Sequence, residues 1–534
     1  MIRALVLLAA SLLSSRVAWT QTAQQAHAGH RSGTLRLPRE LVERPTSIRP
    51  GIGAVQDRVT TSSPDAQRFH NQGLAYLHSF SWIDAARSFH QALRLDPRLA
   101  MAHLGLSYAF SGLNAPAEAR AALDRARGLA GAASARERRR IDIRASELAA
   151  EGDSSDTAKR SAYLTTIDAA LDDDPGAVEV WLLRGHVSAP GDAPRYYERA
   201  LGIVPDYFAA HHYLVHAYED IGRIDSALRH SEAFARLAPA VPHAHHMYGH
   251  DLRRLGRIDE AIAAFSNAYD LERRYYEAEK IAPEHDWHHQ HNLSLLAASY
   301  QYVGETKLAA GLFQRTFSMP SLEIAEELNK RAWPLFLLST GRAQDALNAA
   351  RTLATHSQGI VRAAGHVMAG QAALANGSLS AAADAANAAL AELRRAGEMA
   401  RRIAPDLEAL QGAFFLRSGQ RERGRTMLRE AIRQMRAEPG PDAWTFALFR
   451  LETIAREARQ SGDWEFARYA ADQMRDHDAA YGGTQYSLGL VAEHFGEADA
   501  AAKAYTLAVA AWKRADDEFG ELADARLRLA ALRR

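Results

Sequence analysis

The chain of 534 residues contains no cysteine. Disulfide bonds are therefore excluded, and any metal site has to use nitrogen and oxygen ligands. Net charge is absent as well, since 64 Lys and Arg balance 64 Asp and Glu, and the two signs are interspersed along the chain. This excludes the basic footprint of a nucleic-acid-binding protein. No apolar run reaches the roughly 18 residues of a transmembrane helix, so we expect no membrane span.

The first residues have the pattern of a secretory signal peptide. Arg3 precedes a short apolar run, Ala4–Leu13, and small residues follow it. A charged start, a short apolar core and a small-residue processing zone direct a chain out of the cytoplasm. We therefore predict a signal peptide over residues 1–28, with cleavage after Ala23 or Ala28, and a periplasmic or secreted protein.

The region after the predicted signal peptide is rich in prolines. Residues 29–63 contain Pro38, Pro45 and Pro50 among scattered Gly, Ser and Thr. Proline interrupts regular structure, and such segments are usually linkers. We predict a linker or a loosely attached N-terminal arm here.

The remainder of the chain is organised as repeats of about 34 residues. Gly222 and Gly256 lie 34 residues apart, and three histidine pairs share that spacing: His211/His245, His212/His246 and His216/His250. Further turns are recognisable at Gly304, Gly341, Gly377, Gly419, Gly462 and Gly496. A period of this length indicates helix–turn–helix units that bury their apolar faces only by stacking. We predict an all-α solenoid of about ten or eleven helix pairs.

The repeats fall into regions of different character. Between Gly256 and Gly304 the spacing is 48 residues, about 14 more than one period. The predicted divisions are N-terminal repeats over 64–175, a histidine-rich centre over 176–323, C-terminal repeats over 324–515 and a capping helix over 516–534.

Three segments carry a resemblance to a known family: FHNQGLAYLHSFSWIDAARSFHQALRLDP, HHYLVHAYE and HAHHMYGHDLRRLGRIDEAI. They resemble the tetratricopeptide repeat superfamily and, more narrowly, an uncharacterised group of bacterial exported proteins of that type with a histidine-rich central repeat pair. The resemblance implies a right-handed superhelix in which the first helix of each pair lines a concave ligand-binding face. It also implies that the partner is a peptide or another protein.

Twelve of the 23 histidines lie between His211 and His291. His212 and His246 are each ten residues before a turn glycine, and His216 and His250 are each six before it. The resemblance places these offsets on the concave face, whereas His211 and His245 are expected in the packed core. A histidine pair at i, i+4 projects from one helix face and is close enough to share a metal ion.

Imidazole and carboxylate ligands without cysteine suit zinc, iron, copper or nickel. His243, His246 and His250 share one helix face, and His285, His288 and Asn292 in the inserted region repeat their spacing if Pro283 and Glu284 open a helix. Glu219, on the preceding first helix, is either a further ligand or a general base. The candidate metal ligands are His212, His216, Glu219, His243, His246, His250, His285, His288 and Asn292.

Two functions follow from these patterns. The favoured one is an exported scaffold that binds a peptide or protein in its concave groove, where Arg253 and Arg254 receive a carboxylate such as a peptide end. The alternative is a metal-binding protein or metalloenzyme that uses the central histidines. The spacing does not decide whether the protein is an enzyme, and histidines copied along with a repeat also serve as simple packing residues.

Overall fold

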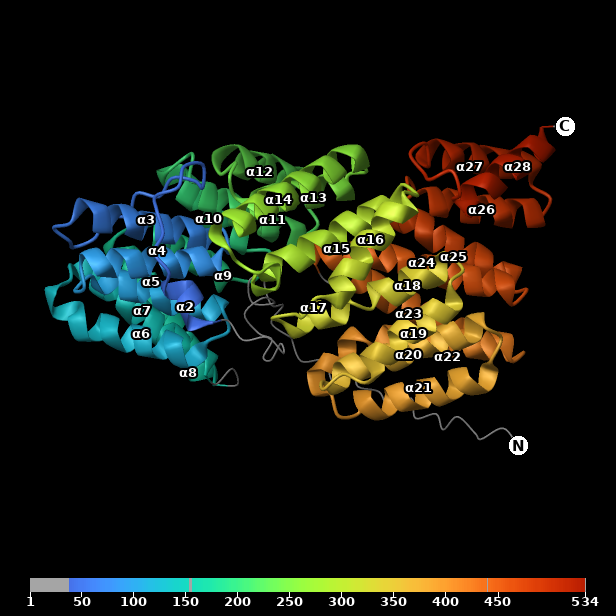
Figure 1. Cartoon of the computed structure of the whole chain (residues 1–534), viewed down its shortest axis with the longest axis horizontal. Helices are drawn as coiled ribbons and strands as arrows, with labels where there is room; N and C mark the ends of the chain where they lie inside the picture. Colours follow the sequence, from blue (N-terminus) through green and yellow to red (C-terminus); the bar gives the residue numbers. More distant parts are fainter. Residues whose placement is uncertain (1–37, 153–155, 439, 534) are drawn as a thin grey trace. The chain divides into compact units, whose positions relative to one another are not determined.

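The computed structural model describes residues 38–152, 156–438 and 440–533 (Figure 1). The predicted signal peptide and the start of the predicted arm lie outside them. Within these ranges the regular elements are helices, and none of these helices is long and apolar enough to cross a bilayer. The chain divides into two compact units. The N-terminal unit comprises the described residues up to His289 with Ser321–Glu323, and the C-terminal unit comprises Gln290–Pro320 and the described residues from Ile324 onward.

The N-terminal unit is built from thirteen helices that follow one another along the chain. They are α2 (Arg39–Glu43), α3 (Pro64–His78), α4 (Trp82–Leu95), α5 (Ala100–Gly112), α6 (Pro116–Leu129), α7 (Ala135–Glu151), α8 (Thr157–Asp173), α9 (Val178–His186), α10 (Ala193–Ile203), α11 (Phe208–Asp220), α12 (Ile224–Leu237), α13 (Pro242–Arg254) and α14 (Ile258–Glu279). A short 3-10 turn, Pro283–His285, then leads to α15 (Trp287–Tyr302), whose first residues belong to this unit.

The C-terminal unit continues from the greater part of α15. Its further helices are α16 (Thr306–Ser318), α17 (Ile324–Asn329), α18 (Ala332–Ser339), α19 (Ala343–Ala354), α20 (Gly359–Ala375), α21 (Leu379–Leu393), α22 (Ala404–Arg417), α23 (Arg421–Ala437), α24 (Pro441–Gln460), α25 (Trp464–His477), α26 (Gly482–His494), α27 (Ala498–Ala511) and α28 (Gly520–Leu532).

Consecutive helices pack against each other as pairs in both units. Among the described residues, α3 to α14 form six such pairs and α18 to α27 form five. The first helices of neighbouring pairs also touch, as α3 with α5 and α20 with α22 do. The prediction of an all-α solenoid with ten or eleven pairs is therefore confirmed.

Most turns inside the pairs contain one residue with a left-handed backbone. Seven of these pairs place glycine there, and so does the turn between α15 and α16, with φ between 71° and 82°. These are the glycines that the sequence predicted: Gly222, Gly256, Gly304, Gly341, Gly377, Gly419, Gly462 and Gly496. Glycine has no Cβ and adopts this conformation without strain. The first two pairs instead use Phe80 (φ 57°) and Asn114 (φ 56°) at the same position.

Glycine also permits the close contact between the two helices of a pair. A Cβ on Gly249 of α13 would lie 2.8 Å from the Phe265 ring of α14, and one on Gly489 of α26 would lie 2.5 Å from the Tyr505 ring of α27. Real Cβ atoms do not approach that closely, so an aromatic ring on the second helix fills the space that the missing side chain leaves.

The predicted insertion lengthens α14 to 22 residues and adds the turn that follows it. The prediction that Pro283 and Glu284 open the next helix is wrong. Pro283 starts the 3-10 turn, Asp286 follows in extended conformation, and α15 begins at Trp287. The Asp286 carboxylate accepts a hydrogen bond from the backbone N–H of His288 at 3.1 Å, so it caps α15 as aspartate commonly does.

The predicted loose arm is also wrong for the residues described, 38–63. Val42, Ile52, Val55 and Val59 are buried in the core of the first repeats. Arg87 of α4 fixes the same segment, because its Nη2 donates to the Pro45 carbonyl at 2.9 Å and to Glu279 at 2.7 Å. Apolar residues between the prolines therefore make this stretch part of the packed structure.

The predicted capping helix begins at Gly520 rather than at 516. Ala525 and Leu529 of α28 are buried with Tyr505, whereas Leu527 is 72 % exposed on the opposite face. One face of this helix therefore covers the last pair and the other meets solvent.

A buried carboxyl group near the fixed segment gives this fold a pH dependence. Asp84 of α4 accepts a hydrogen bond from Tyr275 of α14 at 2.6 Å and lies 3.6 Å from Arg87. Burial raises the pKa of Asp84 to about 6, above the value of about 3.9 in an unfolded chain. The folded state therefore holds more protons between about pH 4 and 6, so the stability that Asp84 contributes is complete below about pH 4 and falls as pH rises through 6.

We predict that Asp84→Asn reduces this loss of stability with rising pH. Between about pH 4.5 and 7.5 the free energy of unfolding should fall less in the variant than in the parent, by about 2 kcal/mol. Urea unfolding at both pH values measures the difference, and Asp65→Asn, at an exposed position, serves as the control. An identical pH dependence in Asp84→Asn and the parent would contradict the assignment.

Candidate functional sites

A cluster of histidines lies in the interior of the N-terminal unit. Its first members are His212 and His216 of α11 and His243 of α13. His212 and His243 are buried, and the side chain of His216 is 12 % exposed. The i, i+4 spacing brings the first two together on one helix face, and the stacking of the next pair adds the third.

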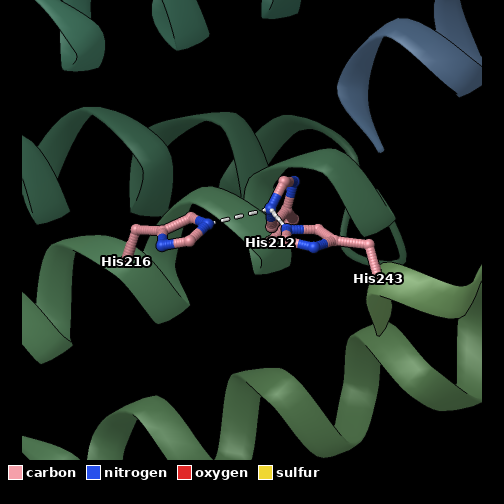
Figure 2. A group of neighbouring side chains, drawn as sticks. All are labelled: His212, His216 and His243. Carbon is pink, nitrogen blue, oxygen red and sulfur yellow. Dashed lines mark hydrogen bonds between the residues drawn. The ribbon is translucent and has the colours of Figure 1, made fainter. Parts of the chain in front are cut away.

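The three imidazoles of this trio converge through the same type of atom. His212 Nε2 lies 3.0 Å from His216 Nε2 and 3.0 Å from His243 Nε2. One ring nitrogen from each of the three residues lies within 4.8 Å of the other two. Figure 2 shows His212 between His216 and His243, with a dashed line joining it to each of them. Three nitrogen donors in this arrangement match the protein ligands of a catalytic or open zinc site.

The tautomer of His212 follows from its other ring nitrogen. His212 Nδ1 lies 2.6 Å from the backbone carbonyl oxygen of His78. A carbonyl oxygen only accepts, so Nδ1 carries the proton and donates it. The lone pair is therefore on Nε2, which faces His216 and His243.

Glu219 follows the trio on the same helix. Its side chain is fully buried, and its oxygens lie 3.7 Å from His216 Nδ1 and 3.5 Å from His250 Nδ1. A buried carboxylate beside the outer nitrogen of a ligand histidine is a common arrangement at metal sites, where it orients the ring and adds negative charge. Glu219 is therefore placed as a supporting group behind His216, not among the converging nitrogens.

The cluster continues from the trio toward the start of α15. The His246 ring lies 4.4 Å from that of His250 and 4.7 Å from that of His288, while His243 and His288 are 5.0 Å apart, all measured between ring centroids. Glu272 accepts hydrogen bonds from Nδ1 of His288 at 2.5 Å and of His289 at 2.7 Å. Although burial opposes the change, these bonds lower the pKa of Glu272, so it remains a carboxylate.

Aromatic rings enclose the trio. Phe80 lies 4.6 Å from His212, 5.9 Å from His216 and 5.4 Å from His243, between ring centroids. Phe234 stacks on His212 at 4.7 Å. Burial, together with the neighbouring imidazoles of His212 and other histidines, holds the pKa of His243 well below its usual range. A neutral imidazole is the form that binds metal ions.

The structure reverses part of the predicted orientation. His212 and His246 were expected on an open concave face but are fully buried. His211 and His245, expected in the core, are partly exposed. His211 contacts His230 of α12 at 2.9 Å, and His245 bonds the Pro239 carbonyl. The reason is that the first repeat packs on α11, so Phe80 and the residues around it cover the face that the repeat pattern leaves open.

The remaining predicted ligands and groove residues lie elsewhere. His285 is in the 3-10 turn and partly exposed, so it does not share a helix face with His288. Asn292 is buried on α15 in the portion that belongs to the C-terminal unit. Arg253 is 2 % exposed, so its guanidinium does not lie open to a peptide from solvent, and the groove prediction is corrected for this residue, whereas Arg254 is partly exposed.

Sequence reasoning missed three residues of this site. His78 and Phe80 are more than 130 residues from His212, and Glu272 lies in the inserted part of α14. For Phe80 a signal exists, since it occupies the turn position that holds glycine in eight other turns. A bulky residue with positive φ costs about 1 kcal/mol or more and usually has a reason in its surroundings.

The C-terminal unit contains a pocket of a different kind. It lies on the first helices of four pairs, α18, α20, α22 and α24, and α18 also touches α24. Apolar side chains make up most of its lining, among them Leu335, Met368, Leu410, Phe446 and Ile454.

Charged groups in and beside this pocket form ion pairs. Arg450 is buried and donates to Asp406 at 2.6 Å and to Glu438 at 2.6 Å. Arg417 donates to Glu457 at 2.7 Å. Gln371 differs, because its Oε1 atom is buried with no hydrogen-bond partner in the described part of the chain. The pocket is therefore mostly apolar, and two buried oxygen atoms of its lining, Gln371 Oε1 and Asp406 Oδ2, have no hydrogen-bond partner within the described residues.

Comparison with known proteins identifies the repeat type. A family model described as tetratricopeptide repeat matches residues 71–134, which run from α3 to the turn before α7. Together with the helix pairs described above, this match confirms that the chain contains tetratricopeptide repeats. A search of curated proteins finds no match.

Two solved structures are similar at low identity. A crystal structure of the MamA protein is 16 % identical, with a TM-score of 0.20, and the match covers 41 % of this chain and 97 % of that one. A crystal structure of PilW, described as a widely conserved type IV pilus biogenesis factor, is 16 % identical with a TM-score of 0.24, covering 41 % of this chain and 96 % of that one.

Proposed function

We propose that this protein is a tetratricopeptide repeat scaffold that binds a segment of a partner protein in the pocket of its C-terminal unit. The observation that carries the proposal is the position of that pocket on α18, α20, α22 and α24, which are the first helices of four pairs. The resemblance to tetratricopeptide repeats implies a ligand on this set of helices, and such folds generally bind peptides or proteins. Fold-level analogy supports the class of partner, and the lining supports its chemistry.

The lining favours a segment with a large apolar side chain. Leu335, Met368 and Leu410 offer an apolar surface, and apolar burial is the main favourable contribution to such binding. The unpaired Oε1 of Gln371 is suited to accept a hydrogen bond from a backbone N–H of the same segment. Arg450 is already paired with Asp406 and Glu438, so these groups do not favour a highly charged peptide.

Export is part of this proposal. Its support is the apolar run Ala4–Leu13 behind Arg3. The mature protein is expected to begin between about residues 20 and 30. N-terminal sequencing of protein from the native cell checks this, and Met1 intact on cytoplasmic protein would contradict it.

Selection of random peptides displayed on phage tests the pocket with the full chain. We expect the selected peptides to share a large apolar residue and to bind as synthetic peptides in fluorescence polarisation. Gln371→Leu should weaken them about tenfold, because it removes the acceptor, and Phe446→Ala should do the same by removing lining surface.

Gln344→Leu is the control, since Gln344 is exposed on α19 away from the lining. Circular dichroism establishes that each variant folds. Failure to select such peptides, or equal binding by the parent and both pocket variants, would overturn the proposal.

A further inference from the structure

We propose that His212, His216 and His243 bind one divalent transition-metal ion through their Nε2 atoms. The site lies inside the N-terminal unit, and the peptide pocket lies in the C-terminal unit. The inference is therefore independent of the proposed function, and either one stands if the other fails.

The distances between the nitrogens agree with one shared ion. Zinc binds histidine nitrogen at about 2.0–2.1 Å, which in tetrahedral geometry places two such nitrogens about 3.3 Å apart. The observed separations from His212 Nε2 are 3.0 Å to His216 and 3.0 Å to His243. Shifts of a few tenths of an ångström bring these two separations to the tetrahedral value.

Hydrogen bonding alone accounts less well for the trio. His212 Nε2 has one lone pair in the ring plane, because the ring proton is on Nδ1, which donates a hydrogen bond to the His78 carbonyl. Two imidazoles at 3.0 Å then compete as donors for that single acceptor. A cation at the common centre satisfies all three lone pairs at once.

The metal-bound arrangement has one cost within the cluster. It places the proton of His243 on Nδ1, which is buried with no hydrogen-bond partner in the described residues. The cost of one unpaired N–H is small beside the free energy with which structural zinc sites form. Coordination therefore outweighs it.

The surroundings supply the outer contacts that metal-binding histidines usually have. His212 donates its Nδ1 proton to the His78 carbonyl, which fixes the tautomer and the ring direction. His216 Nδ1 faces the buried carboxylate of Glu219 at 3.7 Å. A buried dication needs compensating negative charge, and Glu219 is placed to provide it.

Phe80 provides a second, independent observation. It takes a left-handed backbone conformation where eight other turns have glycine, and its ring lies against all three histidines of the trio. Glycine would adopt this turn conformation with less strain. The phenylalanine is explained if its ring limits the access of bulk water to the site, because the low local polarity strengthens the metal–nitrogen interaction.

The ligand set selects the class of ion. Three neutral imidazoles suit zinc, copper, nickel or cobalt, whereas magnesium and calcium require oxygen ligands. We assign the site to the zinc class because that ion accepts three histidines with a further position for water. Zinc and cobalt ions are therefore the probes for the experiment.

The test uses full-length protein purified without an affinity tag and stripped with a chelator. Isothermal titration with Zn²⁺ should show one ion per chain at this site. His216→Gln and His243→Gln should each weaken binding at least about 100-fold, and the double variant should add little, because a coordination site fails as a unit. With Co²⁺, the parent should show the visible absorption of a tetrahedral complex, and the single variants should lose it.

His211→Gln and His245→Gln are the matched controls. They lie on the same two helices, α11 and α13, but outside the trio, so zinc affinity should be unchanged. The apo melting curve of each variant establishes that it folds. His216 is the safer ligand to change, because it is the most exposed of the three. No zinc or cobalt binding by the parent, or equal binding by the ligand variants and the parent, would overturn the proposal.

Phe80→Gly tests the second observation without removing a ligand. Glycine relieves the backbone strain but removes the ring that covers the trio. Zinc affinity should therefore fall about tenfold, and the cobalt absorption should change to that of a more hydrated complex. Asn114→Gly makes the same exchange at the only other such turn in the described residues that lacks glycine, and it should leave affinity unchanged. If Phe80→Gly binds zinc as the parent does, the ring has no role in the site.

Discussion

The hydrogen bond between His212 Nδ1 and the His78 carbonyl determines what the histidine cluster is able to do. It joins residues 134 positions apart, so it exists only when the first repeat packs on α11. Because the carbonyl is only an acceptor, it fixes the His212 proton on Nδ1 and leaves Nε2 as a base facing His216 and His243. The repeat stack, rather than a loop, thus holds the ligand nitrogen in place, which is the arrangement that gives a metal site rigid geometry.

The fold was predictable because most repeats use the same local turn conformation. A left-handed residue ends the first helix, and the eight turn glycines read from the sequence all have positive φ. It was less predictable which helix faces are buried and which are exposed. The repeat pattern assigns His212 and His246 to an open face, but contact with the first repeat buries them. Burial of this kind depends on the curvature of the repeat stack, and the residue spacing within one repeat contains no information about that curvature.

The same limit explains which site residues were found. His212, His216 and His243 were among the candidates because their spacing on two helices is local. His78 and Glu272 enter the cluster only through tertiary packing. Phe80 was detectable in principle, since a bulky residue at a turn position that repeatedly holds glycine marks a local conflict, and such conflicts are often found at functional sites. His285 was misassigned because Asp286, a capping residue, starts α15 after it.

Crystals of the zinc-loaded protein, measured on both sides of the zinc absorption edge, test the central claim most directly. The account predicts one anomalous peak in the N-terminal unit, about 2.0–2.1 Å from Nε2 of His212, His216 and His243, with His212 Nδ1 still bonded to the His78 carbonyl. A trio without a peak, while zinc occupies only other histidines, would contradict it.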